Sequence, residues 1–528
     1  MKKKTVILNT LLTTMVILMS SACTGYFEKL NQDVFGVSEE ELNQDGLALG
    51  GMLQQLERAV IIYRDGNHID SDYQIAYNLC ADTWCGYSSP THTWEDGEHG
   101  SWLFADKWCR SMYSFKYLDC MGGFKAFEAE ATRKGHEAEL ALATVLKVAA
   151  MHQVADYYGP ISYSQYGGLT NLYDPQDQVY EQFFNELDAS IDKLTSIASS
   201  GVKLLEDYDL IYGGDVTRWV RFANSLRLRL AMRISYADPL KAREEAEKSL
   251  SHPLGLILSN SDNAVNKEAG YHPIREAAFV FNDGECHMGA SMDCYLNGYA
   301  DPRGTRYFIA AGDGKLHGVR PGITPSVWTN YLNPANRVSK INADALSVTW
   351  MNAAEVAFLC AEAALKGWDA GRSAQDYYEM GVKLSFEEWN VEGAASYLNN
   401  TTAKPAAFDD VVGRAKASAP STVTIAWNNR DTDEQKLEKI ATQKWLALYP
   451  NGAEAWAEQR RLHYPVLVAP NSNRSNGTVI TEQGARRVPY PADEAVTNPE
   501  AYASAVAALG GRDDAGVRLW WDAKPFNN

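Results

Sequence analysis

The sequence has little positive charge for its length. Its 528 residues include 49 Lys and Arg against 67 Asp and Glu, which gives a formal net charge of −18 and a pI of about 5.1. Proteins that bind nucleic acid usually present a basic surface, so no nucleic-acid partner is expected. Bulk charge does not favour attraction to anionic membranes either. With 45% hydrophobic and 22% charged residues, the composition is typical of a globular protein with a large core.

Cysteines are few, and their spacing is not that of a metal site. Of the eight, Cys23 lies at the end of an N-terminal apolar segment, and the remaining seven cannot all pair within one chain because their number is odd. The close pairs, Cys80 with Cys85 and Cys286 with Cys294, lack zinc-finger spacing. No metal is therefore predicted, and a chain of this size does not require disulfides.

Recognisable catalytic motifs are also absent from the sequence. It contains no P-loop and no HExxH. The stretch GDGKLH at 312–317 has His317 where a dinucleotide-binding loop needs its last glycine, and GASMD at 289–293 is not a nucleophile elbow. DGNHIDSD at 65–72 breaks EF-hand spacing, which favours a surface turn. No cofactor is predicted, although a carboxylate pair of the glycosidase type stays open because geometry defines it and spacing does not.

The N-terminus has the pattern of an export signal. Lys2, Lys3 and Lys4 precede a short apolar run, and small residues come directly before Cys23. The run is too short and too interrupted for a membrane span. Residues 1–22 are therefore predicted to be a lipoprotein signal peptide, with Cys23 as the lipidated first residue of the mature chain. Ordinary cleavage, with Cys23 uninvolved, is the alternative.

Two segments illustrate the helical character of the chain. Residues 136–158 are apolar nearly all round, which predicts a buried helix that ends at Gly159. Residues 350–366 are rich in alanine, so another helix can approach closely, and Cys360 is predicted to be a small core residue there. Ser373 is expected to cap a following helix that runs through Asn390.

The stretch QKWLALYPNGAEAWAEQRRLHYP, residues 443–465, predicts a helical hairpin. Pro450 ends the first helix because the residue before a proline is excluded from the α region. Asn451 can cap the second helix, with Glu454 placed for a capping box. The aromatic residues of this hairpin, including Trp456, are interpreted as packing groups.

A third helix is predicted at 218–235, where apolar residues recur at steps of three and four. Arg218, Arg221, Arg229 and Arg233 lie mostly off the apolar stripe. They are interpreted as a solvated face with carboxylate partners.

Helical hairpins of this kind recur along the chain, at roughly 104–158, 178–236, 350–390 and 434–463. No fixed-period consensus is visible, and pairs of small and large helices suit a scaffold like that of tetratricopeptide repeats (TPR). The sequence therefore predicts a mainly α fold, a TPR-like helix-pair scaffold with a large loop-rich region containing short β-strands. One domain is expected over 23–528, with the scaffold mainly at 46–250, 350–390 and 434–463 and loop-rich regions at about 82–102, 251–348 and 392–432.

Aromatic and polar residues mix in those loops. Flat rings stack on the apolar faces of sugars while polar side chains bind hydroxyl groups; the alternative is that the rings only anchor the loops. The candidate ligand-binding residues are Trp84, Trp94, Asp96, Tyr295, Asn297 and Trp328.

Several segments in order resemble the SusD/RagB family of outer-membrane lipoproteins. They are DYYGPISYSQ at 156–165, YDPQDQVYEQFFNEL at 173–187, GDVTRWVRFANSLRLRLAMRIS at 214–235, AEAALKGW at 361–368, KWLALYPNGAEAWAEQRRLHYP at 444–465 and RRVPYP at 486–491. The resemblance covers nearly the whole chain. Ser20 departs from the family pattern, which has Leu three residues before the lipidated cysteine.

The resemblance implies a TPR-like scaffold, no catalytic residues and a lipid anchor on the outer-membrane surface. It further implies capture of oligosaccharides for a partner SusC-like TonB-dependent transporter. Peptide or other nutrient capture by the same mechanism, as in the RagB branch, is the alternative. A surface hydrolase and a helical-repeat adaptor are two further, less favoured hypotheses.

Overall fold

A computed structural model of the chain describes residues 47–63, 71–92, 94, 98–168, 171–323 and 337–526. Three of the predicted functional residues, Cys23, Asp96 and Trp328, lie outside the described residues. The chain divides into two compact units, residues 1–51 and 52–528, and the helix at 47–60 crosses the boundary between them. A single domain over 23–528 stays a prediction.

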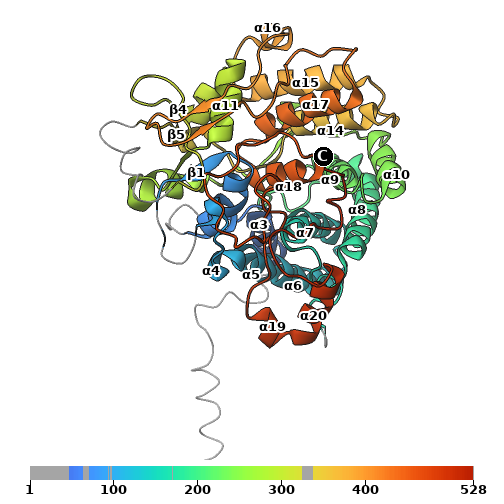
Figure 1. The fold of residues 1–528 in the computed structure, drawn as a ribbon. Coiled ribbons are helices and arrows are strands. Elements are labelled where there is room, and N and C mark those ends of the chain that lie inside the picture. Colours follow the sequence, from blue (N-terminus) through green and yellow to red (C-terminus); the bar gives the residue numbers. More distant parts are fainter. Residues whose placement is uncertain are drawn as a thin grey trace, which may run out of the picture. The chain divides into compact units, whose positions relative to one another are not determined.

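Helices dominate the second unit, as Figure 1 shows. The α-helices are α3 (Leu47–Val60), α4 (Asp106–Cys109), α5 (Ser111–Lys116), α6 (Gly122–Lys134), α7 (Glu137–Tyr158), α8 (Gln176–Ala198), α9 (Val216–Arg233), α10 (Pro239–Leu250), α11 (Ala290–Tyr299), α12 (Gly304–Tyr307), α14 (Ala353–Leu365), α15 (Ala374–Glu388), α16 (Ala394–Leu398), α17 (Asp433–Leu448), α18 (Gly452–Leu462), α19 (Glu494–Thr497) and α20 (Pro499–Ala508). Shorter π-helical and 3-10 turns include η2 (Gln74–Asp82), η3 (His99–Ser101), η4 (Tyr117–Met121), η5 (Asn260–Asp262), η6 (Glu276–Val280), η7 (Phe281–Asp283) and η9 (Ala343–Ala345).

The four predicted hairpins are confirmed as the packed pairs α6–α7, α8–α9, α14–α15 and α17–α18. Local capping sets their ends. Ser373 caps α15 in a capping box with Asp376. At the start of α18, the side chain of Asn451 accepts a hydrogen bond from the backbone amide of Glu454. The mainly α, TPR-like fold class is therefore correct.

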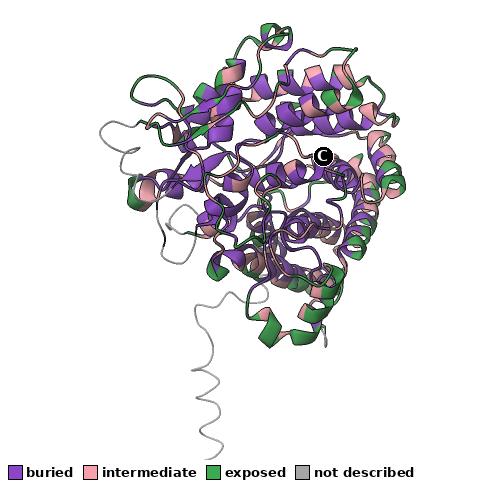
Figure 2. Cartoon of the chain, in the orientation of Figure 1, coloured by how far each residue is buried: buried purple, intermediate pink, exposed green. Residues whose placement is uncertain are grey.

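Helix α7 forms part of the core. It ends at Gly159, as predicted, and its residues from Ala141 onward are almost all buried. Figure 2 shows the buried positions concentrated along α7 and α14. Within the described residues α7 alone is long and apolar enough to cross a membrane, but 78% of its most apolar window is buried inside the protein. Its hydrophobicity therefore serves packing.

The strands are short and fasten the loops. They are β1 (Ser88–Pro90), β2 (Ala264–Val265), β3 (Cys286–Met288), β4 (Phe308–Ile309), β5 (Lys340–Ile341), β6 (Thr349–Met351), β7 (Phe408–Asp409) and β8 (Lys416–Ala417). They pair antiparallel as β1–β3, β2–β6, β4–β5 and β7–β8. This confirms the prediction of loop-rich regions with short strands.

The arginines of α9 correct one expectation. Arg218 and Arg221 are half-buried and share Asp262, at 3.6 and 3.0 Å, in accordance with the interpretation of a solvated face. Arg229 and Arg233 are buried instead, at 4% and 0% exposure. The reason is that carboxylates from other helices meet them inside the protein, so these guanidinium groups need no water.

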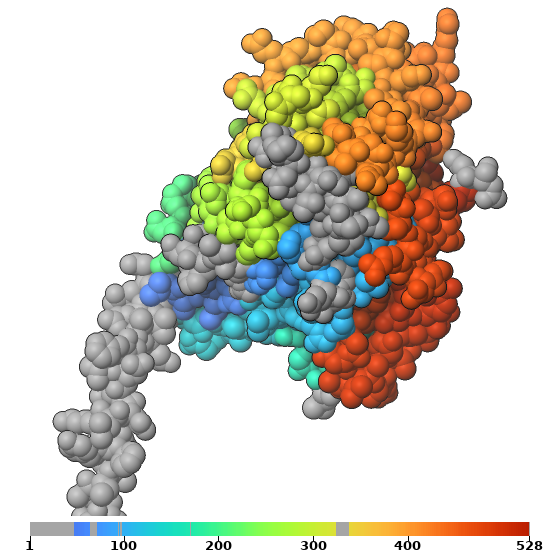
Figure 3. Space-filling view, turned by 60° about the vertical axis from the view of Figure 1, so that its left-hand side comes forward, coloured from blue at the N-terminus to red at the C-terminus, as the bar shows by residue number. Residues whose placement is uncertain are grey.

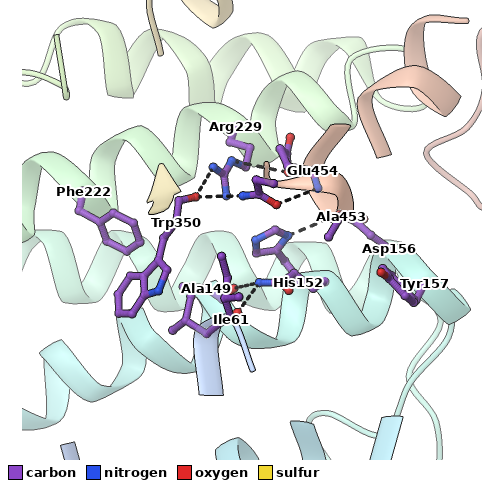
Figure 4. Close-up of a pocket in the computed structure, with 13 residues that line it drawn as sticks. Ile61, Ala149, His152, Asp156, Tyr157, Phe222, Arg229, Trp350, Ala453 and Glu454 are labelled. Carbon is purple, nitrogen blue, oxygen red and sulfur yellow. Dashed lines mark hydrogen bonds and ion pairs between the residues drawn. The ribbon is translucent and has the colours of Figure 1, made fainter. Parts of the chain in front are cut away.

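These carboxylates belong to a buried ionic network centred on α18. Arg229 forms two bonds of 2.7 Å with Glu355 of α14 and lies 3.7 Å from Glu454 of α18. Arg233 donates to Glu454 at 2.5 Å. Figure 4 shows Arg229 facing Glu454 above His152 of α7, around a cavity of about 10 Å³. Charge pairing therefore ties α7, α9, α14 and α18 together.

A third arginine, Arg461, extends this network. It pairs with Glu362 of α14 and with Glu458 of its own helix, both at 2.6 Å, and Lys444 of α17 also bonds Glu458. Burial alone would raise the pKa of Glu458, but the positive charges of Arg461, Lys444 and Arg233 together outweigh it and hold that pKa well below its usual range. The cationic and anionic side chains of the hairpin are thus structural.

The cysteines in the described part of the chain are all buried and unpaired; they are Cys80, Cys85, Cys109, Cys120, Cys286, Cys294 and Cys360. Cys360 is 0% exposed, which confirms it as a small core residue. Burial raises the pKa of its thiol to about 12, so it is unreactive.

Candidate functional site

Strand β1 places the loop after η2 against the beginning of α11. Ser88 pairs with Met288 of β3, and Gly86 lies so close to α11 that a Cβ on it would meet the Cβ of Ser291 at 2.7 Å. Glycine at position 86, with φ of 82°, is therefore required for this approach. Trp84, two residues before Gly86, is therefore held beside α11.

Trp84 is half-buried and has a fixed orientation. Its indole N–H donates to the carbonyl of His99 at 2.9 Å. Its ring stacks on His99 with centroids 5.6 Å apart and lies 4.9 Å from the ring of Trp456. Because these contacts fix the orientation of the ring, the part of it that stays exposed can offer an ordered surface to a ligand.

A cavity of about 320 Å³ lies next to Trp84. Its aromatic wall consists of Trp84, Trp102 and Trp456, and the segments 289–291, 466–470 and 481–486 complete it together with Pro321, Gln459, His463 and Phe526. Figure 3 shows the blue segment around residues 80–110 lying between the yellow-green segment before residue 310 and the red C-terminal segment. Segments far apart in sequence thus build this cavity.

Two glutamines supply polar groups. Gln459, on α18, and Gln483 are half-buried, line the cavity and make no side-chain hydrogen bond within the described residues. A carboxamide offers both donor and acceptor. An apolar aromatic wall with a few free polar groups is the usual composition of a small-molecule site.

The charged and titratable groups at the cavity are largely neutralised. Arg486 is buried and donates to Asp522 at 2.7 Å. His463 stacks on Phe526 at 4.0 Å, and burial lowers its pKa. Burial also lowers the pKa of His99, behind Trp84, to about 3, so that imidazole is neutral. Apart from the exposed carboxylate of Glu482, the described lining is thus largely neutral, so its buried part fits an uncharged ligand better than a charged one.

The described lining offers no arrangement for hydrolysis. Glu482 is the single carboxylate among the described cavity residues, whereas glycosidases need a pair. In the part of the chain that the structure covers, no group of three or more His, Cys, Asp or Glu is placed to hold a metal.

The predicted Trp94 lies on a neighbouring surface. It is half-buried and packs against the cluster of Leu79, Ala105 and Trp108, with its ring edge-on to Trp108 at 5.5 Å. It does not line the cavity. Trp94 therefore remains a candidate for an adjoining aromatic surface.

Tyr295 and Asn297 both lie on α11 but differ in exposure. Tyr295 is 0% exposed, donates to the carbonyl of Val466 at 2.9 Å and packs against Trp445 at 5.3 Å. This corrects the expectation that it forms a ligand platform, because its ring belongs to the core. Asn297 is exposed and donates to Asp293 at 2.8 Å, and it stays a candidate.

Several lining residues were not among the predicted ones, notably Trp102, Gln459 and Gln483. Trp456 was interpreted as a packing group, and its 1% exposure confirms that role while its ring still borders the cavity. The aromatic loop around Trp102 was a usable signal. The glutamines gave none, because an amide on a helix or turn looks the same whether it faces solvent or a cavity.

The fold and site define a class: a helix-pair scaffold that carries a loop-built binding pocket. Residues 29–522 match the model of the SusD-like family, described as Susd and RagB outer membrane lipoprotein. The chain therefore belongs to this family, whose members are binding proteins of the outer membrane.

Solved structures agree. A chitin-binding SusD homologue from Flavobacterium johnsoniae is 35% identical, with a TM-score of 0.85 over 90% of this chain and 98% of that one. A SusD homologue from Bacteroides uniformis is 37% identical, with a TM-score of 0.85 over 90% and 99%. A SusD homologue from Bacteroides thetaiotaomicron is 34% identical, with a TM-score of 0.81 over 90% of this chain and 99% of that one. A search of curated proteins found no match.

Proposed function

We propose that this protein captures neutral oligosaccharides in the cavity beside Trp84. The observation that carries the proposal is the combination of an ordered aromatic wall with two half-buried glutamine amides that have no partner in the described chain. Sugar rings stack on indoles through their C–H faces, and their hydroxyl or acetamido groups bind amides. Binding occurs without catalysis.

Chitin-type oligosaccharides are the first candidates. A 35% identical structural relative is described as chitin-binding. N-acetyl groups carry an amide that complements the carboxamides of Gln459 and Gln483.

We further propose that the protein is anchored to the outer membrane through lipid on Cys23 and passes its ligand to a SusC-like TonB-dependent transporter. The support is the lipoprotein-type N-terminus and the membership of an outer-membrane lipoprotein family. Metabolic labelling with a clickable fatty acid tests the anchor, because Cys23→Ser should abolish the label. Co-purification with the transporter tests the partner.

The central experiment is a calorimetric titration with chito-oligosaccharides, with plant and host oligosaccharides and with mixed peptides. Saturable binding of a sugar is expected. Saturation by peptides alone would contradict the glycan proposal and support capture of peptides in its place.

Two variants locate the site. Trp84→Ala is expected to weaken sugar binding by about tenfold or more because a stacking surface is lost, and Gln483→Ala by roughly threefold to tenfold because one hydrogen bond is lost. The matched control is Trp427→Ala. Trp427 is also half-buried but bonds its neighbour Asn429 at 3.1 Å and does not line the cavity. Equal losses in Trp84→Ala and Trp427→Ala would refute this placement of the site.

A further inference from the structure

A second, larger cavity of about 570 Å³ lies in another part of the molecule. It shares no lining residue with the cavity beside Trp84. Its walls come from the segments 260–267, 345–352, 387–389 and 448–451, together with Arg218 and Glu355. It is large enough to hold a monosaccharide-sized ligand.

A carboxyl group without a cation lines this cavity. Glu388 is the last residue of α15, where the helix dipole disfavours negative charge. Its two oxygens accept only neutral amides, from Asn263 at 3.1 Å and Asn352 at 3.0 Å. No Lys, Arg or His within the described chain pairs with it, whereas Glu355, which also lines this cavity, is matched by Arg229.

Burial raises the pKa of Glu388 to about 8, against a small lowering effect of Asn352. The charged and titratable groups around Glu388 do not offset this rise in its pKa. Glu387 beside it is also acidic and accepts from Asn260 at 3.3 Å, Arg218 lies 3.6 Å from Asp262, and Lys267 is exposed at the rim. Tyr307 and Tyr449 on the other side are buried phenols. A positively charged ligand would meet no competing cation at Glu388.

One residue of the cavity wall has a donor without an acceptor. The indole N–H of Trp389 is buried and has no hydrogen-bond partner among the described residues. The Trp389 ring is held edge-on to Tyr307 at 4.7 Å, so its N–H has a fixed direction. A ligand oxygen that reaches this donor would gain a hydrogen bond.

We propose that this cavity binds a small hydroxylated ammonium compound such as an amino sugar. Its ammonium group would lie against the carboxylate of Glu388, and a hydroxyl oxygen would accept from the indole N–H of Trp389. The inference goes beyond the proposed oligosaccharide capture and does not depend on it.

The test is calorimetric titration at pH 7 with glucosamine, N-acetylglucosamine and glucose. Glucosamine alone carries the ammonium group, so it is expected to bind about tenfold tighter than either neutral sugar or more. Because Glu388 must lose its proton on binding, the measured enthalpy should change between buffers with different ionisation enthalpies, in the sense of proton release. Glucose binding as tightly as glucosamine, or no binding by any of the three, would overturn the proposal.

Two variants of the full chain complete the design. Glu388→Gln keeps the size of the side chain but removes its charge and one acceptor oxygen, and is expected to weaken glucosamine binding about tenfold and to abolish proton release. Trp389→Phe removes the indole N–H together with part of the ring and should weaken binding about threefold; it serves as a second test if Glu388→Gln lowers the melting temperature. Trp84→Ala should leave glucosamine binding unchanged. If Trp84→Ala abolishes it, or Glu388→Gln leaves it intact, the cavity is not the site.

Discussion

The α17–α18 hairpin and the loop-built cavity contain the same kinds of residue in different states. In the hairpin, Trp445 and Arg461 are buried and fully engaged, the latter by Glu362 and Glu458. At the cavity, Trp84 is half-buried and the amide of Gln483 has no partner in the described chain. Function is therefore to be sought where polar and aromatic groups are ordered but not yet satisfied, and the conspicuous family segment at 444–465 serves packing.

The largest expected effect is on the hairpin. Arg461→Met leaves Glu362 and Glu458 buried without their guanidinium, and should lower the free energy of unfolding by about 3–5 kcal/mol. The matched control is Arg243→Met, because Arg243 forms an exposed pair with Glu247 at 2.8 Å and should cost at most about 1 kcal/mol. Urea denaturation measures both. Similar losses of stability in the two variants would mean that the buried pairs of Arg461 stabilise the protein no more than an exposed pair does.

Acid should affect the ionic network of the hairpin and the carboxyl of Glu388 with opposite sign. Arg461 holds the pKa of Glu458 below its value in the unfolded chain, about 4.3. The unfolded state therefore binds its proton first, so the network's stabilisation is present above about pH 4 and is lost as the pH falls further. Melting temperatures should decrease as the pH is lowered below about 4, toward about pH 3. A flat profile would contradict this.

Glu388 should act in the other direction. Its pKa is about 8 in the folded protein, above the unfolded value, so the folded state keeps the proton longer. Stability should therefore fall as the pH rises from about 4 to about 8, and Glu388→Gln should remove that slope. The difference between wild-type and variant melting temperatures across this range measures it.

Helix packing and loop structure also differ in their tolerance of one methyl group. A Cβ on Gly381 of α15 would meet the buried ring of Phe358 at 2.7 Å, so Gly381→Ala should cost about 1–3 kcal/mol despite better helix propensity. Gly270 lies in the loop-rich region with nothing within 4 Å of its Cβ position. Gly270→Ala should change stability by less than about 0.5 kcal/mol. Chemical denaturation compares them, and equal costs would show that the packing of α15 on α14 is loose.

The smallest effects are expected on α11. Tyr295→Phe leaves the carbonyl of Val466 without its donor and should cost about 1 kcal/mol of stability, with sugar affinity unchanged. Asn297→Ala should leave stability within about 0.5 kcal/mol and weaken sugar binding by roughly threefold if Asn297 contributes to capture. Unchanged affinity in Asn297→Ala would remove this residue from the site.

Local signals in the sequence were enough to determine the helices and their ends. Ser373, Asn451 and Gly159 act within a few residues of their own position, so caps and stops can be read without knowing the rest of the fold. The hairpins, the loop-rich regions with short strands and the family followed from such signals. Trp84, which borders the cavity, was singled out in this way, because it stands in a segment dense in aromatic and polar residues.

Only the tertiary structure decided which of these residues are accessible. Arg229 is buried because Glu355, 126 positions away, meets it, and no local pattern encodes that contact. Tyr295 and Trp84 look alike in sequence, yet one is core and the other borders a cavity. Burial depends on what the rest of the chain places opposite a side chain, so the glutamines of the cavity and the uncompensated carboxyl of Glu388 became visible only in the folded protein.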